Sequence, residues 1–269
     1  MIRDDTSITG RALEGDARSN EIWRALDTVL DPELDEPVTS LRFVTRVSVD
    51  GDAVAVDFRL PTYWCSPNFA WIMAEDMRDA LAALPWTSAV TVTLAEHLFA
   101  AKINSAVNSG TGFGEAFADA HGDLTALRAT FRRKAYLGRM ATLVDSLRAA
   151  GRSDTELLAM RVGELRALSG ENDVGPPALR YLELRAVFGG PCGADDAAFR
   201  TLEGEDIAPD ALPSFLRGVR MARRGVEANG EMCRIYLRER TGLEPASSSK
   251  EGSDDLPRVP SDNSPRQGG

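Results

Sequence analysis

The chain has 269 residues, of which 43% are hydrophobic, so it is long enough for one or two domains with buried cores. Its formal net charge is −10, and the first 100 residues carry 17 acidic against 8 basic side chains. This acidic balance argues against a nucleic-acid-binding protein, which needs a basic face. No apolar run approaches the roughly 20 residues that span a bilayer. The polar N-terminal residues do not resemble a secretory signal, so we expect a soluble cytoplasmic protein that does not bind membranes.

The first segment of the chain, residues 1–18, is polar, and we expect it to be a mobile lead-in. A helix is predicted from Ser19, with Ser19 or Asn20 as its cap. Its apolar residues recur at helical spacing, namely Ile22, Trp23, Leu26, Val29 and Leu30. The two prolines in "DPELDEP" end this helix, because proline restricts the residue before it.

A β-hairpin is the clearest local prediction. Apolar and polar residues alternate in "LRFVTRVSV", "DGD" turns the chain, and the alternation returns in "AVAVDFRL". Ser66 then stands at a capping position and Pro67 at the first position of a helix. "TSAVTVTLAE" supplies one more strand. The order α-β-β-α-β predicts a small α+β domain over residues 19–97.

Helical patterns dominate the remaining sequence. We expect a mostly α-helical domain over residues 98–240, in which Ser153 and Glu156 form a capping box. Residues 241–269 are rich in Ser, Pro and Gly, and we predict that they are disordered. The fold class is therefore α+β, followed by a helical region and a disordered tail.

Three cysteines, Cys65, Cys192 and Cys233, show neither CxxC spacing nor an even number, which argues against a disulfide framework. Cys65, in "LPTYWCSP", lies at the junction between a strand and a helix. The partial positive charge of the helix amides favours a thiolate there. Cys192 lies in a turn-like loop, and we expect Cys233 to be a core residue of a helix.

Several oxygen atoms are candidates to join the Cys65 sulfur. The hydroxyl of Thr62 could donate a hydrogen bond to it. If the loop after the first helix packs beside the junction, its acidic residues would approach the thiol; they are Asp31, Glu33, Asp35 and Glu36. Such a set of sulfur and oxygen atoms could hold iron. The alternative is that Cys65 is a small buried hydrophobic residue, as many single cysteines are.

The segments "LDTVLDPEL" and "LPTYWCSP", in this order and around a hairpin, resemble the PaaD/SufT-like (MIP-eighteen type) iron–sulfur cluster assembly domain. Asp31, Pro32 and Glu33 match the family's Asp-Pro-Glu, and Thr62 and Cys65 match its threonine and cysteine. The resemblance covers roughly residues 18–97. Two departures are visible: Ser66 separates the cysteine from the proline, and Arg42 stands where the family usually has glycine.

The resemblance implies a maturation factor and not an enzyme. Cys65 would be a labile ligand for iron or an iron–sulfur cluster, and Asp31 or Glu33 would be a second ligand or would order the loop. A cluster usually has four cysteine ligands, so a homodimer, a partner or an exogenous thiol would complete the set. The long helical extension resembles versions that accompany bacterial di-iron monooxygenases, which would make a di-iron hydroxylase the client metalloprotein.

Other interpretations stay open from the sequence. His97 is a candidate iron ligand, or a polar residue that closes the last strand. A non-metal adaptor, whose helical region binds a hydroxylase or chaperonin, is the alternative function. A cysteine-nucleophile enzyme would need a base near the sulfur, and His97 is its candidate.

Overall fold

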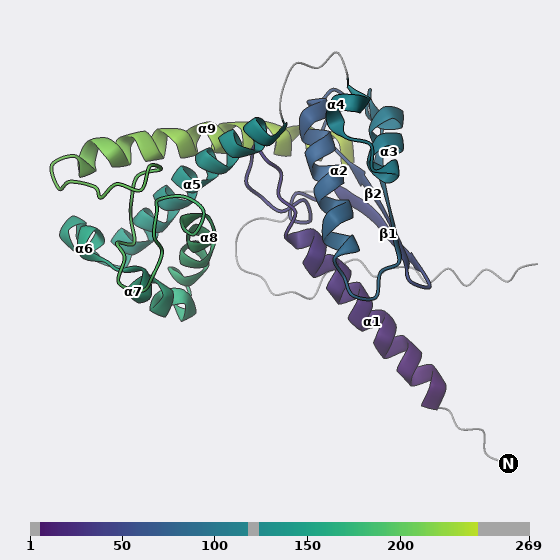
Figure 1. The fold of residues 1–269 in the computed structure, drawn as a ribbon, viewed down its shortest axis with the longest axis horizontal. Helices are drawn as coiled ribbons and strands as arrows, with labels where there is room; N and C mark the ends of the chain where they lie inside the picture. The colour runs from purple at the N-terminus through teal and green to yellow at the C-terminus, as the bar shows by residue number, and fades with distance from the viewer. Residues whose placement is uncertain (1–5, 118–123, 242–269) are drawn as a thin grey trace, which may run out of the picture. The chain divides into compact units, whose positions relative to one another are not determined.

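The computed structural model describes residues 6–117 and 124–241 (Figure 1). They divide into two compact units: residues up to Leu124 together with those from Met232 onwards, and Thr125–Glu231. The first unit contains a three-stranded sheet with helices and the second is helical, which confirms the predicted α+β class. Residues 242–269, predicted to be disordered, lie outside the described residues.

Helix α1 spans Thr6–Asp27. It begins well before the predicted start at Ser19, so Ser19 and Asn20 lie inside the helix and do not cap it. The part of the lead-in from Thr6 to Arg18 is therefore helical, which its content of Ala, Leu, Glu and Arg favours. The predicted apolar face is confirmed, because Ile22 and Leu26 are fully buried.

The predicted hairpin is present, as strands β1 (Val44–Asp50) and β2 (Ala53–Arg59) pair antiparallel. The turn uses Gly51 in the left-handed conformation, with φ 61°. Val54, Val56 and Phe58 of the second strand, and Leu60 just after it, are buried as expected. The first strand departs from strict alternation, because a bulge between Val44 and Arg46 leaves Thr45 exposed.

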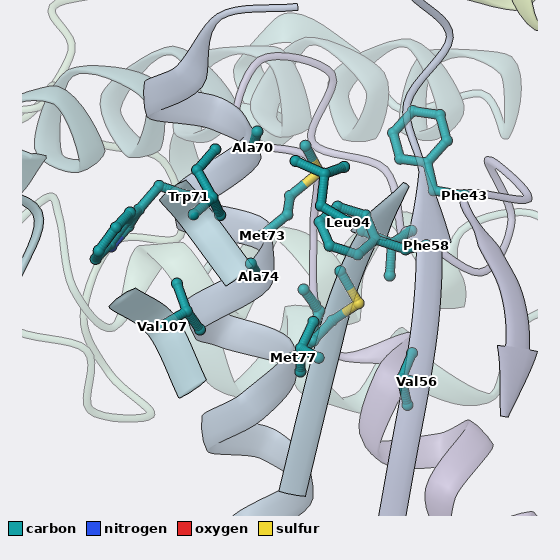
Figure 2. Close-up of a cluster of buried hydrophobic side chains, with 14 of the residues drawn as sticks. Phe43, Val56, Phe58, Ala70, Trp71, Met73, Ala74, Met77, Leu94 and Val107 are labelled. Atoms are coloured by element: carbon teal, nitrogen blue, oxygen red, sulfur yellow. The ribbon is translucent and has the colours of Figure 1, made fainter. Parts of the chain in front are cut away.

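Strand β3 (Ala89–Ala95) pairs parallel with β2, which gives the order β1-β2-β3. A parallel pair needs a crossover, and α2 (Pro67–Ala82) supplies it. Figure 2 shows Met73 and Met77 of α2 pointing toward the sheet residues Phe58 and Leu94, which are all buried. The sheet and α2 therefore share one hydrophobic core.

Helix α3 (Ala100–Ser109) follows β3 and covers its open edge. The side-chain amide of Asn104 donates to the Leu94 carbonyl (3.0 Å) and accepts from the Leu94 N–H (2.8 Å). Asn108, one helical turn later, makes the same pair of bonds with Val92, both 2.9 Å long. The two asparagines thus occupy backbone groups that an unprotected edge strand would offer to another chain. The short helix α4 (Phe113–Ala116) completes this side of the unit.

The second unit is built from helices. Its elements are α5 (Leu124–Ala149), α6 (Asp154–Ala159), α7 (Val162–Ala167), the 3₁₀ helix η1 (Leu168–Gly170), α8 (Gly175–Arg185) and the first part of α9 (Leu212–Thr241). The predicted capping box is confirmed, because Ser153 Oγ accepts from Glu156 N–H and the Glu156 carboxylate accepts from Ser153 N–H. None of the helices among residues 6–117 and 124–241 is long and apolar enough to cross a bilayer.

A buried arginine organises the loop after α8. Arg185 is completely buried, and its guanidinium donates to main-chain carbonyls of that loop; the acceptors are Phe188, Gly190, Pro191, Ala197 and Ala198, at 2.8–3.3 Å. A buried charge is tolerated only when its donors are satisfied. These bonds meet that condition and fix a loop that has no helix or strand of its own.

Arg42 adopts a left-handed backbone conformation with φ 55°. At this position the family that the sequence resembles usually has glycine. A residue with a Cβ pays about 1–2 kcal/mol in this region, whereas glycine enters it freely. The arginine side chain is exposed, so its removal leaves the core intact.

Replacement of Arg42 by glycine should therefore stabilise the first unit by about 0.5–1 kcal/mol, after allowance for the flexibility that glycine adds to the unfolded chain. Urea unfolding followed by tryptophan fluorescence measures this effect, because all four tryptophans lie in the first unit. Arg42→Ala is the matched control, since it removes the guanidinium but keeps the Cβ. Equal stability of the two variants would contradict the prediction.

Candidate functional site

Cys65 lies in the loop between β2 and α2, as the sequence predicts. Thr62 is buried and its Oγ1 lies 3.1 Å from Cys65 Sγ, so the predicted hydroxyl–sulfur contact is confirmed. Ser66 precedes α2 at the expected position, but its side chain does not cap the helix. The Ser66 carbonyl instead accepts from the N–H groups of Phe69 and Ala70, both at 3.1 Å.

The loop after α1 is a turn organised by Asp31. Its Oδ1 accepts from the N–H groups of Glu33 (2.9 Å) and Leu34 (2.8 Å), and this places the carboxylate inside its own loop. Pro32, between these residues, favours such a turn. Burial raises the pKa of Asp31 to about 6, although the two N–H donors oppose the rise. Asp31 is only 8% exposed, so the carboxylate is costly to ionise where it stands.

A pocket of about 200 Å³ brings the two loops together. Of the predicted site residues, its wall contains Asp31, Glu33, Thr62, Cys65 and Ser66. The rest of the wall is largely apolar and includes Phe43, Leu60, Phe69 and Met73. The sequence predicted that carboxylates would approach the thiol if the acidic loop packs beside the loop of Cys65. Asp31 and Glu33 of the acidic loop do line the pocket with Cys65.

Glu36, a third acidic residue of the same loop, has a different role. Its carboxylate accepts two bonds from Arg234 Nη1, at 2.8 and 3.1 Å. Arg234 belongs to the last part of α9, which lies in the same compact unit. This ion pair fastens the end of α9 to the loop that carries Asp31 and Glu33.

His97 contacts the main chain of the cysteine loop but does not line the 200 Å³ pocket. Its Nδ1 accepts from the Phe99 N–H (3.2 Å), so the ring proton is on Nε2, which donates to the Cys65 carbonyl (2.9 Å). A metal at His97 would have to displace one of these bonds. The same bonds weaken the cysteine-nucleophile hypothesis, because its candidate base contacts the carbonyl of Cys65 and not the sulfur.

Cys233, which the sequence suggested was a core residue, lines the same pocket as Cys65. It is half-buried on α9. Burial raises the pKa of its thiol to about 11, and the charges of Asp31, Cys65 and Glu33 contribute to the rise. No spacing in the sequence links the two cysteines, so only the tertiary structure shows that they share a pocket.

The pocket is not a finished metal centre. Within residues 6–117 and 124–241, no group of three or more His, Cys, Asp or Glu side chains is placed to hold a metal ion. What the pocket offers is two thiols with two carboxylates at its wall. Thiols suit iron–sulfur chemistry and carboxylates suit harder ions, so the donor types fit iron.

Residues 19–94 match the model of a family described as iron-sulfur cluster assembly protein. Comparisons with curated proteins and with solved structures found no match. The chain thus carries an iron–sulfur cluster assembly domain at residues 19–94, which confirms the resemblance at this level and supports a general role in cluster assembly. Asp31, Glu33, Thr62 and Cys65 lie inside the matched segment, whereas His97 and Cys233 lie outside it.

The raised pKa of Asp31 predicts a pH-dependent stability. The folded protein holds this proton up to about pH 6, whereas the unfolded chain loses it near 3.8. The stability that Asp31 contributes is therefore complete below pH 3.8 and is lost as the pH rises through about 6. An asparagine at this position would keep the acceptor for both N–H groups without the charge.

We expect Asp31→Asn to be more stable than the wild type above pH 7, by on the order of 2 kcal/mol, with the gap closing toward pH 4. Urea midpoints of the metal-free protein across this range measure it. The exposed Asp50→Asn controls for the loss of one negative charge. A gap that does not change with pH would show that burial of the charge is not the cause.

Proposed function

We propose that this protein is a metallocentre maturation factor, which holds iron or an iron–sulfur cluster transiently at Cys65 and passes it to a client protein. The observation that carries the proposal is the pocket that Cys65, Asp31 and Glu33 line together, inside a domain that matches the iron–sulfur cluster assembly family. The metal is the cargo of the protein, so the protein acts as an accessory factor and not as an enzyme.

The chemistry of the pocket supports delivery over storage. A bound cluster normally has four cysteine ligands, and the matched domain supplies only Cys65. Asp31 would be a poor permanent ligand, because burial already makes its carboxylate costly to ionise. A cargo held by an incomplete set exchanges its remaining ligands readily, with a second copy of the chain, a small thiol or the client.

The surface beside the pocket supports contact with a client. Tyr63 and Trp64, next to Cys65 in the chain, are 53% and 56% exposed. Their rings meet edge to face, with centroids 4.5 Å apart. Thr62, Trp64 and Tyr236 line both the 200 Å³ pocket and an open groove of about 640 Å³. Exposed aromatic side chains are typical anchors of protein interfaces.

We further propose that the domain is of the PaaD/SufT-like type and that the client is a di-iron hydroxylase of a bacterial monooxygenase. The support is the resemblance in "DPE" and "TYWC", together with the long helical region that follows the domain. Delivery would take place in the cytoplasm, where iron–sulfur assembly requires reduced thiols.

The test compares wild type, Cys65→Ala and Cys192→Ala after anaerobic purification and exposure to ferrous iron and sulfide. Iron, acid-labile sulfide and the absorption spectrum are measured for each. We expect wild type and Cys192→Ala to bind iron and Cys65→Ala to lose it, because Cys192 lies in the other unit. Absence of iron from the wild type would refute metal carriage and favour the non-metal adaptor.

A further inference from the structure

The last part of α9 contributes a wall to the Cys65 pocket through Met232, Cys233 and Tyr236. This wall lies far along the chain from the matched segment, which ends at residue 94. The pocket is therefore not a property of the assembly domain alone, because a segment outside that domain supplies one of its two thiols.

Several contacts hold Cys233 in this position. Leu237, one helical turn after Cys233 and on the same helix face, is only 3% exposed and belongs to the core of the first unit. Arg234, the next residue, makes the ion pair with Glu36. Cys233 is thus flanked by a hydrophobic anchor and an ionic one, and both attach α9 to the loops of the site.

We propose that Cys233 is the second thiolate ligand of the iron held by Cys65. This inference rests on the proposed function and extends it, since it assigns to the same chain a ligand that the matched domain lacks. On binding, each S–H bond is replaced by an S–Fe bond and two protons pass to solvent, with no change in oxidation state. Asp31 and Glu33 at the wall would favour the positive charge of the metal.

The number of thiolates in one chain determines how many chains are needed to hold a cluster. A [2Fe–2S] cluster takes four cysteine ligands, two on each iron. One chain with Cys65 and Cys233 would therefore satisfy one iron, and two chains would satisfy the whole cluster. This fits a carrier that assembles a cluster between two copies and releases it when the copies separate.

The test is an anaerobic titration with Co²⁺, whose thiolate-to-metal charge-transfer band grows with the number of thiolate ligands. All proteins carry Cys192→Ser, so that Cys65 and Cys233 are the only thiols. We expect Cys65→Ser and Cys233→Ser each to reduce the band to about half or less. An unchanged band in Cys233→Ser, with a reduced band in Cys65→Ser, would overturn this inference and leave the proposed function standing.

The remaining outcomes also decide between the two proposals. An unchanged band in Cys65→Ser would overturn both of them. Absence of the band from the parent protein would overturn the two-thiolate site. Tryptophan fluorescence of each variant checks that the first unit is folded, and Cys233→Ala serves as a second variant if the serine disturbs it.

A second measurement tests directly, in the metal-free protein, whether the two thiols lie close together. A bifunctional bimane becomes fluorescent only after both of its arms have alkylated thiols. The metal-free parent should give fluorescent protein, and Cys65→Ser or Cys233→Ser should not. Two labelled thiols without fluorescence would show that Cys65 and Cys233 do not meet, which would overturn the proposal.

Discussion

The parallel pairing of β2 with β3 is the constraint on which the site depends. Parallel strands need a crossover, and the crossover starts at the loop that carries Cys65. The parallel pairing also places the C-terminal ends of β2 and β3 at the same end of the sheet, so the loops that follow these strands are neighbours. Two hydrogen bonds connect these loops, from His97 Nε2 to the Cys65 carbonyl and from the Leu98 N–H to the Tyr63 carbonyl. The cysteine is therefore positioned by the sheet and is not on a free loop.

The acidic loop contains a buried carboxylate, Asp31, whose ionised form is destabilised by its burial. The Asp31 carboxylate would be most stable in water, yet the turn that it organises buries it beside the thiols. Groups with pKa values shifted by burial gather at functional sites, although ion pairs inside a fold also shift them. Here the shift comes mainly from burial and not from a paired charge. The buried, ionised Asp31 therefore lowers the stability of the folded protein, and a cation in the pocket would offset this loss.

The local features of the domain could be predicted from the sequence, because they depend on neighbouring residues. The hairpin followed from alternation and a glycine turn, the start of α2 from Pro67, and the Thr62–Cys65 contact from a hydroxyl shortly before the cysteine. The early start of α1 was missed because its polar first turns lack an apolar face. The bulge at Thr45 was missed because it depends on the partner strand. The place of Cys233 in the Cys65 pocket was missed because it depends on tertiary structure and leaves no trace in local spacing.

The position of Cys233 in the chain makes its place in the pocket informative. The segment that supplies this thiol returns to the first unit only after the chain has passed through the helical unit, Thr125–Glu231. Leu237 is buried and Arg234 pairs with Glu36 of the acidic loop, so this part of α9 packs against the first unit. Those contacts close the Cys65 pocket with a second thiol. The end of α9 from Met232 onwards, which belongs to the first unit, therefore forms a wall of the pocket.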